Sequence, residues 1–227
     1  MSLACETCPV RDSAACSVLT EEERNELARA GRTRHLSRGD TLFTAGDEDT
    51  ACATLVSGAL KITAYDEDGN ERILALIHPT GFVGEMFAPF PAHDVVALTD
   101  SQLCVFARAD MTRALEQHPA LTRALLRRSQ EDLHLARKLL ALGSGFGANE
   151  QVSKLLLALA QAASDSPCHP RLQFELPLTR GEMANMLGVT IETVSRVLTA
   201  LERARIIERK GARGIDILAP PRLENFS

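Results

Sequence analysis

The stretch Leu178–Leu201, LTRGEMANMLGVTIETVSRVLTAL, carries the clearest structural signal in the chain. Thr179, followed three residues later by Glu182, is typical of a capping box, in which two side chains satisfy the free backbone groups at a helix start. Gly188 supplies the left-handed residue that ends this first helix, and Thr190 caps a second one. The pattern predicts two short helices joined by a glycine turn, which is a helix-turn-helix.

The second of these helices has one apolar face and one polar face. Its apolar residues recur at three- and four-residue spacing, which indicates packing, at Val194, Val197, Leu198 and Leu201. On the polar face, Arg196 can donate to a guanine, Glu192 can accept from a cytosine, and Ser195 can reach a base or a phosphate. The alternative is a solvated face with an incidental Glu192–Arg196 ion pair. We interpret the helix as one that reads base edges in the major groove.

A hairpin follows this helix. Ile206-Ile207 and Ile215–Leu218 are expected to be short strands, joined by a segment that contains two glycines and three cations. The whole module is therefore predicted to be a winged helix-turn-helix whose cations contact phosphate. The predicted DNA-binding residues are Thr179, Arg180, Thr190, Glu192, Thr193, Ser195, Arg196, Lys210 and Arg213.

The run TIETVSRVL, residues 190–198, resembles the recognition helix of the CRP/FNR transcription regulators. The spacing of Glu192, Ser195 and Arg196 resembles the oxygen-sensing FNR/FixK branch of that family, and the resemblance extends over nearly the whole chain. It implies a homodimeric regulator, mainly an activator, that binds palindromic double-stranded DNA with TTGAT-type half-sites and contacts RNA polymerase.

Charge is distributed unevenly along the 227 residues, although the formal net charge is only −5. Residues 1–110 hold nine Lys and Arg against 18 Asp and Glu, whereas residues 178–213 hold seven against four. A basic excess confined to one module is expected if only that module contacts phosphate. The chain has no apolar run of eighteen residues and no apolar signal core, so we expect a soluble, cytoplasmic protein.

In that compartment, six cysteines favour metal or redox chemistry over a disulfide framework. Cys5, Cys8 and Cys16 form a C-x2-C-x7-C array among polar residues, which argues against incidental thiols or a packing role. A zinc site and an iron–sulfur cluster both fit this spacing, and both require a fourth ligand. The candidates for that ligand are Cys52, Cys104 and Cys168.

The family resemblance narrows this choice. In the FNR branch, an N-terminal cysteine triplet and a later cysteine hold an oxygen-labile [4Fe-4S] cluster, and the matching positions are Cys5, Cys8, Cys16 and Cys104. The loop between the second and third cysteines is longer here than in the family prototype, at small entropic cost. Because some FixK-type regulators have no cluster, the alternative is a regulator of this family that responds through zinc, thiol redox chemistry or a gas-binding cofactor.

From His35 to Arg108, short apolar runs alternate with turn residues, which predicts a β-roll or barrel. The expected strands are Thr41–Phe43, Ala53–Ser57, Ala59–Tyr65, Glu71–Ile77 and Leu98–Phe106. The runs AGDE, SGALKI and DGNERI resemble the cyclic-nucleotide-binding fold. However, the segment Met86–Ala97, which follows Gly84-Glu85, contains no Arg, Lys, Ser or Thr for a phosphate. We therefore expect no cyclic nucleotide to bind, because a buried phosphate without a cation is costly.

Helices are predicted on both sides of these strands. Thr20 and Glu23 form a second capping box, which begins a short helix that ends at Gly31. A longer helix is predicted to follow Pro119 and to reach about Leu142, and another spans Asn149–Ala163. In the long helix, leucines recur every seven residues opposite small residues, a pattern typical of a dimer seam, although the helix can instead pack on its own domain. The predicted dimerisation residues are Leu126, Leu133, Ala136 and Leu140.

The predicted fold is therefore α+β, in four segments. They are a cysteine-rich cluster-binding segment (1–19), a cyclic-nucleotide-binding-like β-roll sensor (20–118), a dimerisation helix with hinge (119–146) and a winged helix-turn-helix domain (147–227). The histidines His78, His93 and His118 are scattered, and no spacing pairs them. With no catalytic motif, we expect no catalytic residues and no enzyme. A β-roll metalloenzyme and a plain interaction protein are the alternatives, and neither explains the polar helix face.

Overall fold

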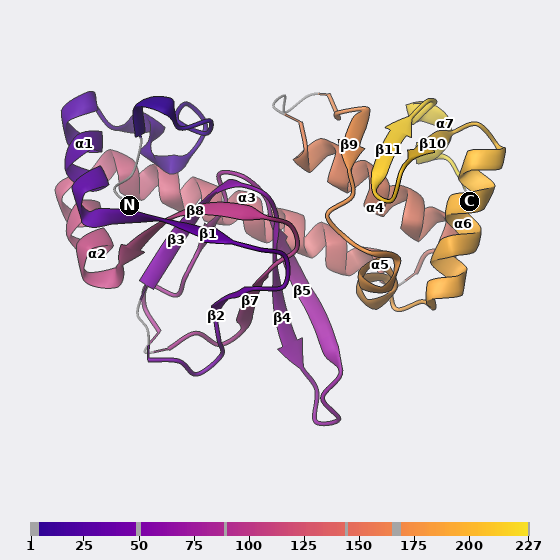
Figure 1. Ribbon diagram of the computed structural model, residues 1–227, viewed down its shortest axis with the longest axis horizontal. Helices are drawn as coiled ribbons and strands as arrows, with labels where there is room; N and C mark the ends of the chain where they lie inside the picture. Colours follow the sequence, from indigo (N-terminus) through magenta and orange to yellow (C-terminus); the bar gives the residue numbers. More distant parts are fainter. Residues whose placement is uncertain (1–4, 49–50, 89, 144, 165–168, 227) are drawn as a thin grey trace. The chain divides into compact units, whose positions relative to one another are not determined.

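The computed structural model describes residues 5–48, 51–88, 90–143, 145–164 and 169–226 (Figure 1). The chain divides into two compact units, one within residues 1–64 and 75–135 and the other within residues 65–74 and 136–227. Each unit is described by itself. None of the helices in the described ranges is both long enough and apolar enough to cross a membrane.

The first unit combines eight strands with helices that flank them in the sequence. In chain order the elements are two 3-10 turns, η1 (Cys5–Thr7) and η2 (Ala15–Val18), then α1 (Glu21–Ala30), β1 (Gly31–Leu36), β2 (Thr41–Phe43), β3 (Ala51–Ser57), β4 (Leu60–Tyr65), β5 (Glu71–Ile77), β6 (Phe82–Val83), β7 (Asp94–Ala97), β8 (Ser101–Ala107), α2 (Arg108–Gln117) and α3 (Pro119–Leu142). The tip of the β4–β5 hairpin and the C-terminal end of α3 belong to the second unit.

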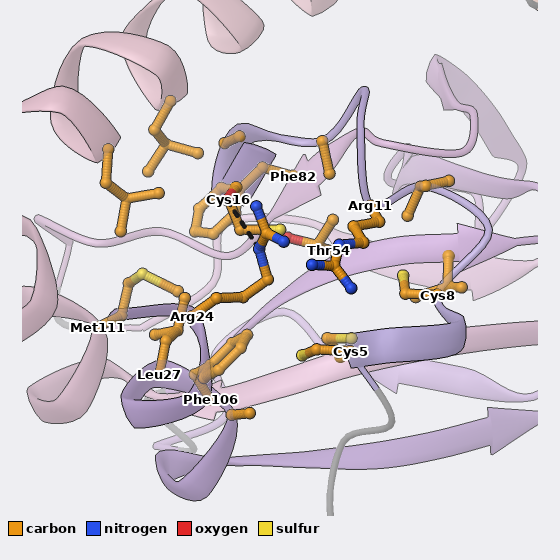
Figure 2. A pocket seen from close by; sticks show the side chains of 18 residues that line it. Cys5, Cys8, Arg11, Cys16, Arg24, Leu27, Thr54, Phe82, Phe106 and Met111 are labelled. Carbon is orange, nitrogen blue, oxygen red and sulfur yellow. Dashed lines mark hydrogen bonds between the residues drawn. The ribbon is translucent and has the colours of Figure 1, made fainter. Parts of the chain in front are cut away.

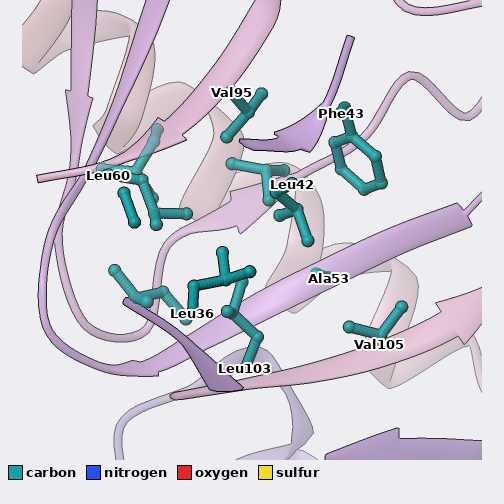
Figure 3. Close-up of a cluster of buried hydrophobic side chains, with 12 residues drawn as sticks. Leu36, Leu42, Phe43, Ala53, Leu60, Val95, Leu103 and Val105 are labelled. Atoms are coloured by element: carbon teal, nitrogen blue, oxygen red, sulfur yellow. The ribbon is translucent and has the colours of Figure 1, made fainter. Parts of the chain in front are cut away.

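The strands form two four-stranded sheets, in the orders β1-β8-β3-β6 and β2-β7-β4-β5. Their facing sides share one apolar core, to which the first sheet contributes residues such as Leu55 and Leu103 and the second contributes Leu60 and Val95 (Figure 3). Because side chains alternate along a strand, Leu103 and Val105 enter this core while Cys104 lies on the opposite face of β8. The cysteine is thereby presented on the outside of the β-roll.

The second unit is the helix-turn-helix with its wing. Its elements are α4 (Ala148–Ala162), β9 (Gln173–Glu175), α5 (Arg180–Leu187), α6 (Ile191–Arg203), β10 (Ile207–Lys210), β11 (Gly214–Ile217) and α7 (Pro220–Glu224). The strands form a sheet in the order β10-β11-β9. Helix α4 contacts α5, α6 and α7, and α5 contacts α6. The apolar face of α6 is buried at all four predicted positions, which are Val194, Val197, Leu198 and Leu201.

The α+β architecture predicted from the sequence, with an N-terminal β-roll and a C-terminal winged helix-turn-helix, is confirmed. Both capping boxes form, at Thr20 and at Thr179, and Gly188 ends α5 with a φ of 66°. The predicted strand Leu98–Phe106 is wrong, because β7 ends at Ala97 and β8 begins at Ser101. Leu98 was expected to begin the strand because it is apolar. It is instead a buried turn residue whose N–H donates to the carbonyl of Ala59.

Several elements were not predicted, among them three edge strands, the helix α7 and the strand β7, which lies between β2 and β4. β1, β6 and β9 each lie at the edge of their sheet. β1 has the polar sequence GRTRHL, whereas β6 and β9 span two and three residues. Edge strands need no alternating apolar pattern, because one side of the ladder is open. Helix α2 was also missed, and β10 extends to Lys210, beyond its expected end at Ile207.

Replacing Leu201 by alanine should lower the free energy of unfolding of the second unit by about 2–5 kcal/mol, because the change leaves a cavity. Leu201 is 0% exposed, whereas Leu218 in the same unit is 54% exposed. Leu218→Ala should therefore cost no more than about 0.5 kcal/mol. Urea unfolding followed by circular dichroism measures both variants, and equal losses would contradict this packing.

Candidate cysteine pocket and nucleic-acid interface

Four cysteines line one pocket on the outer face of the β-roll. Cys5 lies in η1, Cys8 follows it, and Cys16 lies in η2, while Cys104 enters from β8. These are the four residues predicted as ligands, and all four are free thiols. The cavity is small, about 50 Å³, and otherwise mostly apolar. Figure 2 shows three of the cysteines grouped with two arginines, Arg11 and Arg24.

The other candidates for the fourth ligand are not among the residues of this pocket. Cys52 is 1% exposed, and its Sγ lies 3.8 Å from the carbonyl of Phe106, to which it donates weakly. Its surroundings are those of a packed structural thiol, and burial raises its pKa to about 12. Cys168 lies outside the described residues.

The pocket opposes ionisation of its own thiols. Burial, followed by the neighbouring cysteines, raises the pKa of Cys16 and brings that of Cys104 to about 12. Thiolates in this place therefore need a positive partner, which a metal centre supplies. Across the described residues, no group of three or more His, Cys, Asp or Glu side chains is arranged to hold a metal ion.

Helix α3 closes one side of this pocket. Leu121 and Leu125 line it, and one turn further the Nη2 of Arg128 donates to the carbonyl of Ser13 at 3.1 Å. Ser13 lies in the loop between Cys8 and Cys16, so this bond ties the loop to the helix across 115 positions of sequence.

A second tie from α3 involves Asp132. Its carboxylate accepts a hydrogen bond from the backbone N–H of Phe82, another residue of the pocket wall. Burial raises the pKa of Asp132, while the neighbouring Arg128 and the Phe82 N–H act in the opposite direction. Leu121, Leu125, Arg128 and Asp132 recur at three- and four-residue spacing, so they share one face of the helix.

A different face of α3 is apolar and exposed. Leu126, Leu133 and Leu140 are 61%, 49% and 52% exposed, which is unusual for a regularly repeated leucine. At 3.6 residues per turn, this row lies about a quarter-turn or more away from the pocket face. Ala136 is half-buried beside it. The structure thus leaves the predicted dimerisation leucines outward, as a two-helix seam requires.

The predicted base-reading residues gather at the N-terminal end of α6. Thr190 caps the helix by accepting the N–H of Thr193 at 3.2 Å. Arg196 donates to the Thr193 hydroxyl at 3.1 Å, which is not the Glu192–Arg196 pair considered from the sequence. The carboxylate of Glu192 is held ionised, since its backbone N–H, the Thr190 hydroxyl and then Arg196 lower its pKa.

Helix α5 and the wing supply further polar groups. Arg180 donates to the hydroxyl of Ser195 at 3.4 Å, which links the two helices of the motif. One groove is lined by Thr179, Arg180 and Arg213, which brings together three residues that the sequence predicted for DNA contact. The guanidinium of Arg213 also donates to the carbonyl of Pro177 at 3.3 Å.

Of the three wing cations, Arg209 is the one that pairs with a carboxylate of α6. Its Nε lies 3.0 Å from the Oε2 of Glu202, an ion pair that joins the wing to α6 and lowers the pKa of Glu202. Lys210 pairs with Glu208 at 2.9 Å but is exposed. Arg209, which is not among the predicted DNA-binding residues, thus positions the wing, and phosphate contact by Lys210 and Arg213 stays a prediction.

The sequence did not predict that three charged residues lie near the cysteines. Arg24, Arg128 and Asp132 occur singly in amphipathic helices, where a solvated face is the ordinary reading. No spacing signal separates them from exposed charges. The partner of His118 was also not predicted, since its Nδ1 lies 3.2 Å from the Oε1 of Glu23.

The loop after β6 is closed by its own residues. The carboxylate of Glu85 accepts the N–H of Ala92 at 2.9 Å, so the glutamate has an internal partner. Gly84 adopts a φ of 119° beside Cys52 and has no room for a side chain. Gly84 and Glu85 thus have structural roles in this loop.

Comparisons with known proteins agree with this architecture. A family model for the Crp-like helix-turn-helix domain matches residues 150–226, and one for the cyclic nucleotide-binding domain matches residues 33–118. The transcriptional activator protein FnrL of Cereibacter sphaeroides is 33% identical over 93% of this chain and 86% of its own length. The nitrogen fixation regulation protein FixK of Bradyrhizobium diazoefficiens is 33% identical over 97% of this chain and 92% of its own.

A solved structure shows the same fold. FixK2 from Bradyrhizobium japonicum superposes with a TM-score of 0.76, covering 87% of this chain and 97% of that one at 23% identity. The similar proteins are transcription regulators, not enzymes, as the lack of a catalytic motif predicted.

Replacing Arg128 by alanine should speed amide hydrogen exchange between Cys8 and Cys16 roughly fivefold, the equivalent of about 1 kcal/mol for one hydrogen bond. The reason is that the Ser13 carbonyl loses its donor. Arg127→Ala is the matched control, since its side chain is 74% exposed and its nearest approach to Glu131 is 4.0 Å. Mass spectrometry of exchanged peptides measures both, and equal exchange in the two variants would show that Arg128 does not hold the loop.

Proposed function

The chain belongs to the CRP/FNR family of DNA-binding transcription regulators, and we propose that it is an oxygen-responsive member whose four pocket cysteines hold a [4Fe-4S] cluster. Dimers are typical of this family, and we propose that two chains associate through α3 to bind a TTGAT-type palindrome. A regulator of this kind works by contacting RNA polymerase at the promoter, and we propose the same for this chain.

One observation carries the proposal: thiols from both ends of the first unit, at Cys5, Cys8, Cys16 and Cys104, line one pocket. The donor set fits the cofactor, since iron–sulfur clusters are held by four cysteine thiolates. The position of Cys104 on the outer face of β8 also fits, because its strand neighbours Leu103 and Val105 occupy the core. When bound, the cluster supplies an iron–sulfur centre that reacts with oxygen.

The closest alternative is a thiol or zinc site with the same residues. Zinc requires its ligands to meet around one atom, whereas each cysteine of a four-iron cluster ligates its own iron. Metal and sulfide analysis separates these two, and a gas-binding cofactor would differ from both in its absorbance spectrum.

Helix α3 connects the cysteine pocket to the surface at which two chains would associate. Arg128 and Asp132 attach one face of the helix to the loop of Ser13 and to Phe82, so the helix position depends on how the cysteine segment is held. The exposed leucines on another face of the same helix supply the surface for a second chain. An ordered cysteine segment therefore favours a helix position in which that leucine row is paired.

Association of two chains matters because each recognition helix reads only one half-site. Arg196 is suited to the guanine of TTGAT, and Glu192 to the cytosine on the opposite strand. Thr179, Arg180, Thr190, Lys210 and Arg213 are suited to phosphate contacts. Two such helices held about one helical turn apart bind cooperatively, whereas a monomer keeps only half of the contacts.

Cys104→Ala should weaken retention of iron and acid-labile sulfide by more than about tenfold in anaerobically purified protein, because one ligand is lost. Cys52→Ala is the matched control and should keep the wild-type content, since Cys52 is buried against Phe106 and is not among the residues that line the pocket. Elemental and sulfide analysis per chain gives both values. The cluster assignment fails if Cys104→Ala retains a full complement or if Cys52→Ala loses it.

Arg196→Ala should weaken binding of the anaerobic protein to a TTGAT palindrome by about 1–3 kcal/mol, roughly fivefold to 150-fold. Arg113→Ala removes the same charge from an exposed site on α2 and should leave the affinity within about twofold. Fluorescence anisotropy with labelled palindromic and scrambled duplexes measures both. A similar loss on both duplexes would mean that Arg196 contacts phosphate rather than a base.

A further inference from the structure

Arg24 of α1 is a buried cation at the cysteine pocket. Its side chain is only 8% exposed, and it is one of the residues that line the cavity. The Nε donates to the carbonyl of Cys16 at 3.4 Å, and the Nη2 donates to the carbonyls of Ser17 at 3.4 Å and Leu19 at 3.0 Å. Figure 2 shows the guanidinium beside the cysteines, with its bond to Cys16 dashed.

All three recorded acceptors are neutral. Among the ion pairs of the described residues, none includes Arg24. A buried charge normally has a charged partner, because removing it from water costs several kcal/mol in practice. Carbonyl groups offset part of this cost but leave the charge uncompensated. The arrangement is therefore electrostatically incomplete with protonated, neutral thiols around it.

An anionic group in the pocket would complete the arrangement. Four thiolates carry four negative charges, which exceed the positive charge of one zinc ion or of the iron and sulfide of a [4Fe-4S] core. Either assembly is therefore anionic overall. The guanidinium also favours the ionised form of its neighbours, since it lowers the pKa of Cys5 and Cys16 against the larger effect of burial.

We propose that Arg24 is the counter-cation of the thiolate-held cofactor, a positioning residue that fixes the Cys16 backbone and stabilises the negative charge of the bound group. The inference rests on the proposed function for the identity of that group. It extends the function by assigning the residue that sets how tightly the group is held and how readily it accepts an electron. Net charge near a cluster and hydrogen bonds around it are the protein's means of setting its reduction potential.

Three variants separate charge from hydrogen bonding. Arg24→Gln keeps a donor for the Leu19 carbonyl but removes the charge, and Arg24→Lys keeps the charge with different donor geometry. Arg29→Gln removes the same charge from an exposed position near the end of α1 and is the matched control. Each protein is purified anaerobically, checked for folding by circular dichroism, and titrated with a chemical reductant while the visible absorbance of the cluster is followed.

Arg24→Gln should make one-electron reduction about tenfold less favourable, which is 59 mV for a one-electron couple. Arg24→Lys and Arg29→Gln should stay within about twofold of the wild type. If Arg24 only organises the backbone, the Lys and Gln variants should lose stability alike and the reduction equilibrium should not follow charge; that result would overturn the proposal. Should Arg24→Gln fail to fold, a folded Arg24→Lys variant that shifts the equilibrium by tenfold would overturn it equally.

A chelator competition distinguishes this inference from the proposed function. If the wild-type protein holds zinc and no sulfide, the cluster assignment fails. The role of Arg24 is then tested by zinc release, which should be about 10–100-fold easier in Arg24→Gln than in Arg29→Gln. Suppose instead that the wild type holds the cluster and that Arg24→Gln equals it in both the reductant titration and the chelator competition. The cluster assignment is then correct, and the assignment of Arg24 as its counter-cation is wrong. A wild-type chain that binds neither metal would overturn both.

Discussion

The structure depends on one helix that serves two surfaces at once. Along α3, residues from Leu121 to Asp132 contact the cysteine pocket through two leucines, an arginine and an aspartate. The leucine row that begins at Leu126 remains exposed on another face of the same helix. Because a helix is stiff, a change in how one face is held alters the position of the other. The helix itself can couple the two surfaces, since a packed element with two possible positions can be shifted from one to the other by binding at either surface.

The cysteine pocket adds an electrostatic requirement to this mechanical one. It gathers thiols whose ionisation is opposed by burial and by one another, and it places the buried Arg24 beside them. Thiols around a cation that bonds only to carbonyl groups among the described residues make a poor hydrophobic core, because each buried charge is costly unless it has a charged partner. The same groups make a suitable cradle for an anionic, metal-containing cofactor. The segment that carries Cys5 to Cys16 is thus expected to be held more firmly when such a cofactor is present, which is the condition that α3 can detect.

Much of this molecule could be predicted from its sequence because the signals are local. The capping boxes at Thr20 and Thr179 and the glycine at 188 define helix ends within a few residues, and all three form as expected. The spacing of Cys5, Cys8 and Cys16 likewise predicted three residues that the fold brings to one pocket, and the family resemblance supplied the fourth, Cys104. What could not be predicted depends on tertiary contacts. Arg24 and Arg128 look like ordinary exposed charges in a helical pattern, and only the packing of α1 and α3 on the β-roll gives them buried or long-range partners. Leu98 shows the same limit, since an apolar residue in a buried turn cannot be told from strand by composition alone.

We propose that cofactor occupancy in the pocket controls the pairing of two α3 helices. The most direct test is sedimentation velocity of the wild-type protein at one fixed concentration under anaerobic conditions and again after exposure to air, with iron and sulfide per chain determined on the same samples. We expect a dimer that contains iron and sulfide before exposure to air, and a weaker association, approaching monomer, once the sulfide is lost. A chain with the same association state whether or not it contains inorganic sulfide would contradict it.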